Sequence, residues 1–142
     1  MAAEQTIDCL FCKIVKKQIP AKIIDENEHA IAFLDINPAS NGHTLVIPKK
    51  HYRNVGLTDI TYLNGMMRLV KNVTTYLEET FIDITGFNYL SNTNAQAGQI
   101  IFHTHIHIIP KYNKDVGFVF KANKDETNML PIDTVYEKLK KK

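Results

Sequence analysis

Three histidines spaced two residues apart carry the clearest chemical potential in this sequence, namely His103, His105 and His107. In an extended strand, side chains two residues apart project from the same face. A strand is expected at about 102–110, so the sequence predicts a row of three imidazoles, here called the histidine row, on one side of it. Imidazoles arranged in this way can bind a metal ion, act on a phosphate group, or divide these tasks.

The two cysteines of the chain, Cys9 and Cys12, have the C-x2-C spacing of half a metal site. A structural zinc ion takes four ligands in a tetrahedron, usually cysteine sulfur and histidine nitrogen atoms. Because a strand rises about 3.3 Å per residue, the ends of the histidine row lie roughly 13 Å apart, and one ion can bind at most one or two of its members. His51 follows a predicted strand, where a loop can turn its side chain back. We favour Cys9, Cys12, His51 and His103 as the ligands, although spacing alone leaves this pairing open.

Two other interpretations of the cysteine pair stay open. A thioredoxin-like redox pair is expected within a parallel βαβ pattern, which does not surround these residues. Two ordinary buried thiols are the third interpretation. A disulfide is not expected, because the N-terminus lacks the basic-then-apolar layout of a secretion signal and indicates a cytoplasmic protein, in which thiols stay reduced.

Phosphate chemistry is the second use of the histidine row. Imidazole is mostly neutral near pH 7 and can attack phosphorus, which splits one difficult displacement into two easier ones. Its other ring nitrogen must be held by an acceptor such as a backbone carbonyl, and neighbouring imidazoles can donate to the phosphate oxygens. The amide-rich loop from Asn92 to Gln99 leads into the row, and Gly98 allows a close backbone approach. Three alternating histidines beside such a loop favour chemistry over a merely solvated polar face.

Periodic patterns predict the elements that position these groups. Apolar runs bounded by turn residues predict strands at about 22–25, 29–34, 43–48, 87–92 and 102–110. Helical spacing predicts helices at about 10–17, at 58–80 with Thr58 as the N-cap, and from Pro131 to the end of the chain. Short strands joined by tight turns, with one long helix inserted, predict an α+β fold built on an antiparallel sheet of about five strands.

Length and composition indicate one globular domain, and the charge distribution restricts its possible partners. No apolar run approaches the roughly 20 residues needed to span a bilayer, so we expect no membrane partner. The formal charge of +2 depends on lysines among the last five residues. The rest of the chain is therefore not a basic platform, and we expect no nucleic-acid partner. Small anionic substrates remain open.

With these residues in view, the chain resembles the histidine-triad (HIT) superfamily of nucleotide hydrolases and transferases, and within it the Hint-like bacterial branch that retains zinc. The pattern His-x-His-x-His followed by two apolar residues is the signature that names the family, and 103–109 matches it fully. Further matching segments, in the same order as in the family, lie at 11–14, 19–20, 32–36, 42–49 and 97–99. The resemblance implies a single HIT domain over 1–142, with a core of about 9–112 and a C-terminal extension of 113–142.

The resemblance also implies roles for individual positions. His105 matches the nucleophile that becomes nucleotidylated, His107 the residue that contacts the phosphate and leaving group, and His43 a further active-site histidine. The zinc ligands implied are Cys9, Cys12, His51 and His103. The substrate contacts implied are Asn92, Gly98 and Gln99 on the phosphate side, Asp35 at the ribose hydroxyls, and Phe11, Ile14, Phe33 and Ile36 around the base.

One position departs from the family pattern. Many Hint-type members carry a serine or threonine after Gly-Gln, where this chain has Ile100. An isoleucine cannot donate a hydrogen bond, so help to the leaving group must come from elsewhere. His107 is not replaced by glutamine, which disfavours the nucleotidyltransferase branch.

The function expected is hydrolysis at the α-phosphate of nucleoside phosphoramidates or related nucleotide conjugates, through a nucleotidyl-histidine intermediate. A dinucleoside polyphosphate hydrolase, and a nucleotide-binding or interaction module with incidental turnover, are the alternatives. Zinc is expected to be structural, because four protein ligands leave no open position. The family further implies a homodimer in which one sheet continues across both subunits.

Overall fold

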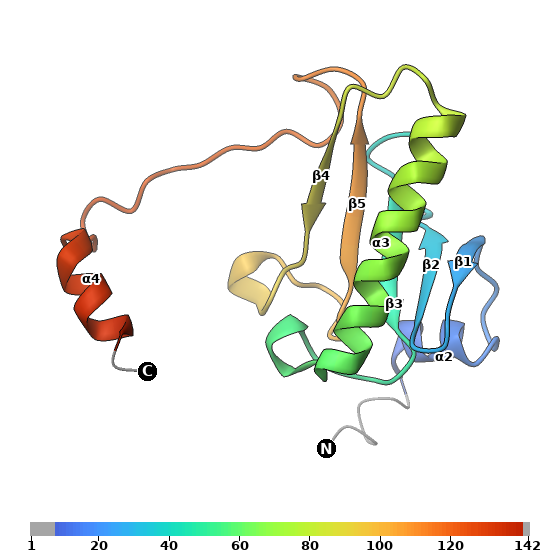
Figure 1. Cartoon of the computed structure of the whole chain (residues 1–142), viewed down its shortest axis with the longest axis horizontal. Coiled ribbons are helices and arrows are strands. Elements are labelled where there is room, and N and C mark those ends of the chain that lie inside the picture. Colours follow the sequence, from blue (N-terminus) through green and yellow to red (C-terminus); the bar gives the residue numbers. More distant parts are fainter. Residues whose placement is uncertain (1–7, 141–142) are drawn as a thin grey trace.

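Five antiparallel strands form one sheet, which confirms the expected α+β architecture (Figure 1). The structure is a computed structural model that describes residues 8–140. The strands are β1 (Ile23–Glu26), β2 (Ala30–Leu34), β3 (Thr44–Pro48), β4 (Gly86–Leu90) and β5 (Ile106–Lys111), in the spatial order β1-β2-β3-β5-β4. The helices are α2 (Leu10–Val15), α3 (Ile60–Thr80) and α4 (Ile132–Leu139). Short 3-10 turns occupy Val55–Leu57 and Ala95–Ala97.

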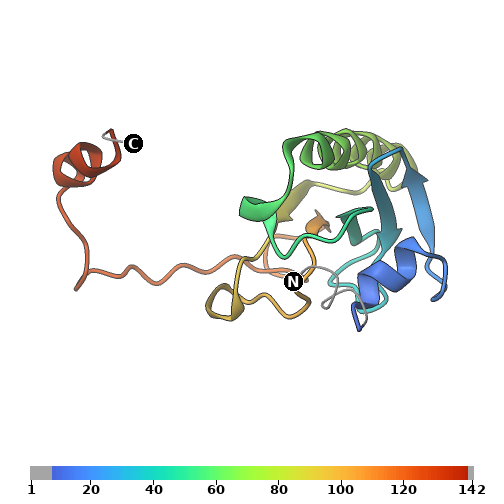
Figure 2. The ribbon, with the colours of Figure 1, turned by 90° about the horizontal axis from the view of Figure 1, so that it is seen from below.

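Strand alternation divides the interior between the two faces of the sheet. On one face, Ala30 and Ala32 of β2 pack against the apolar stripe of α3. On the other face, Ile31 and Phe33 pack with Phe11 of α2. The two helices thus cover opposite faces, as Figure 2 shows. His107 pairs with Leu45, which belongs to the α2 side, so the histidine row opens toward α2.

The N-cap of the long helix α3 lies one residue later than predicted. Asp59 is its N-cap, and its carboxylate accepts a hydrogen bond from the Thr61 amide at 2.9 Å. Thr58, the predicted N-cap, instead hydrogen-bonds through its hydroxyl to Thr104 at 2.7 Å. Gly65 within the helix lies against the β1–β2 turn, where an added Cβ would come within 2.8 Å of the His29 Cβ.

The strand that carries the histidine row is shorter than predicted, and this expectation was wrong in part. β5 begins at Ile106, so only His107 of the row lies in regular strand. The preceding segment leaves the sheet because the Thr104 amide donates to the carbonyl oxygen of Tyr52 at 2.8 Å, beyond the end of β3. The three imidazoles therefore need not share one face, and His103 is free to turn toward the cysteines.

The chain beyond β5 extends away from the sheet as an arm that ends in α4 (Figures 1 and 2). The helix expected near Pro131 is confirmed, with Pro131 as its N-cap. No residue of α4 is buried, and its stripe of Ile132, Val135, Tyr136 and Leu139 is exposed. Within residues 8–140, no helix is both long and apolar enough to cross a membrane.

Candidate functional site

Two cysteines and two histidines converge beside the start of α2, in the combination that the sequence predicted. The candidate ligand atoms of Cys9, Cys12, His51 and His103 all lie within 4.8 Å of one another. The Cys12 Sγ is 3.2 Å from the His51 Nδ1 and 3.4 Å from the His103 Nδ1, which is itself 3.2 Å from the His51 Nδ1. A tetrahedral zinc ion with bonds of about 2.0–2.3 Å separates its ligand atoms by roughly 3.3–3.8 Å. The cluster therefore has the donor types and dimensions of a zinc site.

The protonation of this cluster also fits a metal. The Nε2–H of His103 donates to the carbonyl oxygen of Pro48 at 3.1 Å, which leaves the lone pair of its Nδ1 facing the cysteines. Burial lowers the pKa of His103 to about 4, so this ligand is neutral at pH 7. Burial raises the pKa of the Cys12 thiol to about 12, so a metal must displace the thiol proton to bind there.

His105 does not belong to the cluster and instead lines a cleft. Its Nδ1–H donates to the carbonyl oxygen of His103 at 2.7 Å, so the neutral ring carries its lone pair on Nε2. Burial lowers the pKa of His105 below the ordinary value for histidine, which keeps the ring neutral near pH 7. The ring packs edge-on against Phe11, with centroids 5.1 Å apart. These contacts fix a neutral, oriented imidazole, which is the form that can attack phosphorus.

His43 and His107 form a hydrogen-bonded chain whose proton positions are set by the backbone. The amide of Ala39 donates to the His43 Nδ1 at 3.0 Å, so the neutral His43 ring carries its proton on Nε2. That Nε2 lies 2.9 Å from the His107 Nδ1, which must accept the hydrogen bond. The neutral His107 ring therefore carries its own proton on Nε2. Burial lowers the pKa of His107 to about 4.

Asp35 completes this group, and the three side chains also satisfy the distances of a metal site. Its carboxylate lies 3.5 Å from the His43 Nε2 and accepts the Asn37 amide at 2.8 Å. A metal on the His43 Nε2 would require lone pairs on both nitrogens of that ring, since Nδ1 already accepts a hydrogen bond from the Ala39 amide. Neutral imidazole has only one such nitrogen, so the geometry favours a proton chain over a metal here.

A cleft of about 400 Å³ opens between α2, β2 and the start of β5, within the size range of small-molecule sites. It brings together most of the residues expected to contact the substrate: Phe11, Ile14, Phe33, Asp35, Ile36, Asn92, Gly98, His105 and His107. Its lining is mainly apolar, and His105 and His107 contribute imidazoles to it. His43 is placed behind His107 and is not among the cleft's lining residues.

Gln99, expected as a phosphate-side contact, is placed differently from the other residues of its loop. It is buried, its amide nitrogen donates to the carbonyl oxygens of Arg53 and Ile101, and its amide oxygen accepts from the Asn94 amide. It does not line the cleft. Gly98 has a φ of +98°, where a Cβ would be strained and would lie 3.3 Å from the Asn92 Nδ2. Gln99 thus holds the loop, while Gly98 and Asn92 face the cleft.

Sequence reasoning missed several contributors to this site, among them the Ala39 amide and Leu45. The Ala39 amide that orients His43 carries no side-chain signal and could not have been found from residue types. Leu45 lines the cleft, and its alternation with His43 along β3 was a usable signal.

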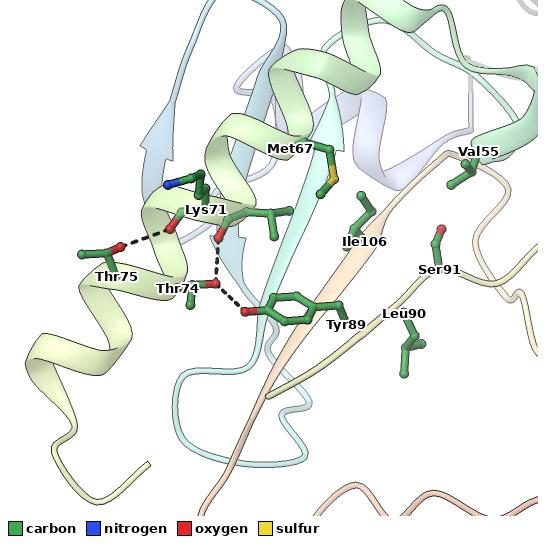
Figure 3. Close-up of a pocket in the computed structure, with 10 residues that line it drawn as sticks. Val55, Met67, Lys71, Thr74, Thr75, Tyr89, Leu90, Ser91 and Ile106 are labelled. Carbon is green, nitrogen blue, oxygen red and sulfur yellow. Dashed lines mark hydrogen bonds between the residues drawn. The ribbon is translucent and has the colours of Figure 1, made fainter. Parts of the chain in front are cut away.

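A larger hollow of about 740 Å³ lies on the α3 side, between α3, β4 and β5 (Figure 3). Met67, Tyr89 and Ile106 border it, and the Tyr89 hydroxyl contacts Thr74 at 2.8 Å. None of the described residues that line it is a histidine, cysteine or carboxylate. It therefore offers apolar surface but not the chemistry of the cleft.

Comparison with known proteins identifies relatives over nearly the whole chain. The profile of the HIT domain matches residues 16–114. An uncharacterized HIT-like protein of Mycoplasma genitalium is 44% identical over 137 residues, covering 96% of this chain and 95% of its own. A Candida albicans protein named adenosine 5′-monophosphoramidase is 33% identical over 135 residues, covering 93% and 89%.

Solved structures agree with this family and with the fold. A HIT family protein from Bacillus anthracis superposes with a TM-score of 0.86 at 32% identity, covering 94% of this chain and 96% of that one. A zinc-bound histidine triad family protein from Mycobacterium smegmatis has a TM-score of 0.73 at 33% identity, covering 86% and 88%. The resemblance inferred from the histidine row is confirmed.

Proposed function

The chain belongs to the HIT domain family, and from this premise we propose that it cleaves nucleoside phosphoramidates or related nucleotide conjugates at the α-phosphate through a nucleotidyl-His105 intermediate. The observation that carries the proposal is the 2.7 Å hydrogen bond from the His105 Nδ1 to the His103 carbonyl oxygen, which directs the lone pair of Nε2 to the cleft. The similarity to a named phosphoramidase supports the substrate class.

The nucleotide would lie with its base on the apolar lining and its phosphate beside the histidines. Phe11, Ile14 and Phe33 offer the apolar surface, together with Ile36 at the mouth. Asp35 at the cleft wall can accept hydrogen bonds from the ribose hydroxyls. The amide of Asn92 can donate to the phosphate oxygens.

In the first step, the His105 Nε2 forms a bond to the α-phosphorus as the phosphorus–leaving-group bond breaks. The electron pair of the broken bond stays with the leaving group, which takes a proton from the Nε2 of a protonated His107. Although burial lowers the pKa of His107, a bound phosphate anion stabilises its cationic form. In this cationic form the His107 Nδ1 also carries a proton, so the Nε2–H of the neutral His43 turns from His107 to the Asp35 carboxylate, which lies 3.5 Å away.

In the second step, water attacks the nucleotidyl-His105 phosphorus and the nitrogen–phosphorus bond breaks. His107, now neutral, takes one proton from the water and returns to its cationic state. His105 is restored as a neutral ring, and the product is a nucleoside monophosphate. One residue thus acts as acid and then as base.

Zinc is the metal that the Cys9, Cys12, His51 and His103 cluster fits best, and we propose a structural role for it. Two thiolates and two imidazoles complete a tetrahedron, which leaves no position for substrate or water. When bound, the ion would fix the start of α2 to the segment that precedes β5.

Replacement of His105 by alanine tests this assignment. We expect turnover of an adenosine phosphoramidate to fall by at least about 10³-fold, because the covalent route is lost, while one zinc ion per chain is retained. Loss of both zinc and activity in this variant would contradict the assignment of His105 as a nucleophile that lies outside the metal site. Hydrolysis of dinucleoside polyphosphates with equal efficiency would favour the alternative substrate class. Nucleotide binding without turnover of any conjugate would favour a binding module.

We also propose a homodimer that uses the α3–β4 surface. β4 is an edge strand, and unpaired edges can pair with another chain. The hollow beside it exposes Met67 and Tyr89. Met67→Glu is expected to convert a dimer to a monomer in sedimentation, and a monomeric parent protein would contradict the assembly.

A further inference from the structure

A second pocket of about 370 Å³ adjoins the cleft and shares one wall with it. Leu10, Ile100 and Ile101 line both spaces. Ile100 is 86% exposed and Leu10 41% exposed, so the top of this wall is an uncovered apolar surface. A substrate held in the cleft by its phosphate would have this wall next to its leaving group if that group points away from the base.

The chemistry of the second pocket differs from that of the cleft. The Arg53 guanidinium carbon lies 4.3 Å from the centroid of the Phe102 ring, so the cation is stacked on an aromatic face. The carboxylate-bearing Asp8 and the metal-cluster residue Cys9 line the same pocket. The pocket is thus lined by one cationic and one anionic side chain, and is not a purely cationic site for an anion.

We propose that this second pocket is a leaving-group subsite for an uncharged amine with an aromatic or bulky apolar substituent, and that Ile100 is its specificity-determining residue. The proposal rests on the proposed function and names the leaving group that this site prefers. The substituent would pass over Leu10 and Ile100 toward the planar face of Arg53, which can stack on a second aromatic ring. A small leaving group such as ammonia would leave this apolar wall in water.

The reaction itself is unchanged by this preference. The phosphorus–nitrogen bond of an N-substituted phosphoramidate breaks, the electron pair goes to nitrogen, and the nitrogen takes the proton of His107 to leave as the neutral amine. Water then cleaves nucleotidyl-His105, which is the same intermediate for every adenosine conjugate. Selectivity must therefore appear in kcat/KM and in the rate of nucleotidylation, because these include the step in which the amine departs.

Two probes and four forms of the protein test the proposal. The probes are adenosine 5′-phosphoramidate, whose leaving group is ammonia, and its N-benzyl derivative. We expect the parent protein to favour the benzyl compound in kcat/KM on the order of tenfold, as is typical for a few apolar carbon atoms in a pocket. Ile100→Ser should bring this ratio close to one, while Ile100→Val should keep most of it.

Ile82→Ser is the matched control, because Ile82 is 92% exposed and lies away from both pockets. It should keep the ratio of the parent protein. The subsite would be overturned if the parent protein gave a ratio near one, or if Ile100→Ser left the ratio unchanged. In either case a nucleotidyl-His105 adduct would still support the proposed function. Absence of any adduct with both probes would overturn the proposed function and this inference with it.

Discussion

His103 holds His105 through its backbone while its own side chain faces the cysteines: its carbonyl oxygen accepts from the His105 Nδ1 at 2.7 Å, and its Nδ1 lies 3.4 Å from the Cys12 Sγ. One residue thus belongs to the candidate metal cluster and also sets the tautomer of the candidate nucleophile. A metal ion at the cluster would therefore fix the direction in which His105 attacks, without taking part in the reaction.

Metal removal should slow nucleotidylation more than it weakens nucleotide binding. Release of His103 lets its carbonyl oxygen shift, and a misplaced nucleophile loses rate, here on the order of tenfold. Single-turnover kinetics and equilibrium binding of adenosine monophosphate, each with chelator and after zinc is restored, measure the two effects. Equal nucleotidylation rates with and without metal would show that the metal cluster does not position His105.

Zinc binding should release protons at pH 7. The pKa of Cys12 is raised to about 12 by burial, so its thiol is protonated before the metal arrives. Burial lowers the pKa values of His51 and His103, so the two imidazoles contribute none. Calorimetric titration in buffers of different ionisation enthalpy should detect at least one proton released per zinc. A value of zero would exclude Cys12 as a thiolate ligand.

The metal-free protein should lose stability as the pH falls from 7 to 5. The pKa of His103 is lowered to about 4 in the folded protein, whereas an unfolded histidine titrates near 6.5, so below pH 6.5 the unfolded chain binds more protons. The free energy of unfolding therefore decreases on acidification, by about 2 kcal/mol from this residue at pH 5. Urea unfolding in chelator at both pH values measures the change. A free energy that is constant or rises on acidification would contradict a neutral, buried His103.

His43→Asn should lower kcat while the zinc content stays constant. The variant removes the Nε2 that lies 2.9 Å from the His107 Nδ1, so His107 loses its orientation and the acid step is slowed, by on the order of 10²-fold. His43 lies outside the lining of the cleft, so KM should change little. Full activity in this variant would show that the Ala39–His43–His107 chain has no part in catalysis.

The sheet, the long helix and the metal cluster could be predicted because each leaves a local signal. Continuous apolar runs marked β2 and β3, helical spacing marked α3, and C-x2-C marked half of the cluster. The start of β5 could not be predicted, because it depends on a long-range bond from the Thr104 amide to Tyr52. Strict alternation in the sequence predicted a straight row, but the bend before Ile106 is what separates His103 from His105.

The cleft was predicted less completely than the metal cluster. Its lining residues come from α2, β2, the loop before β5 and β5 itself, so their meeting depends on the tertiary fold. The family pattern implied about half of them. It did not distinguish Gln99, whose buried amide holds the loop, from Asn92, which lines the cleft. That distinction depends on side-chain partners that only the folded structure provides.

His105 is expected to form a covalent bond to the nucleotide, and intact-mass analysis after rapid acid-free quenching detects that bond. The protein is mixed with an adenosine phosphoramidate, its mass is recorded over the time course, and the modified peptide is sequenced. We expect a transient gain of one adenosine monophosphoryl group on His105, which is absent from His105→Ala. An adduct on another residue, or steady turnover with no adduct in the parent protein, would contradict it.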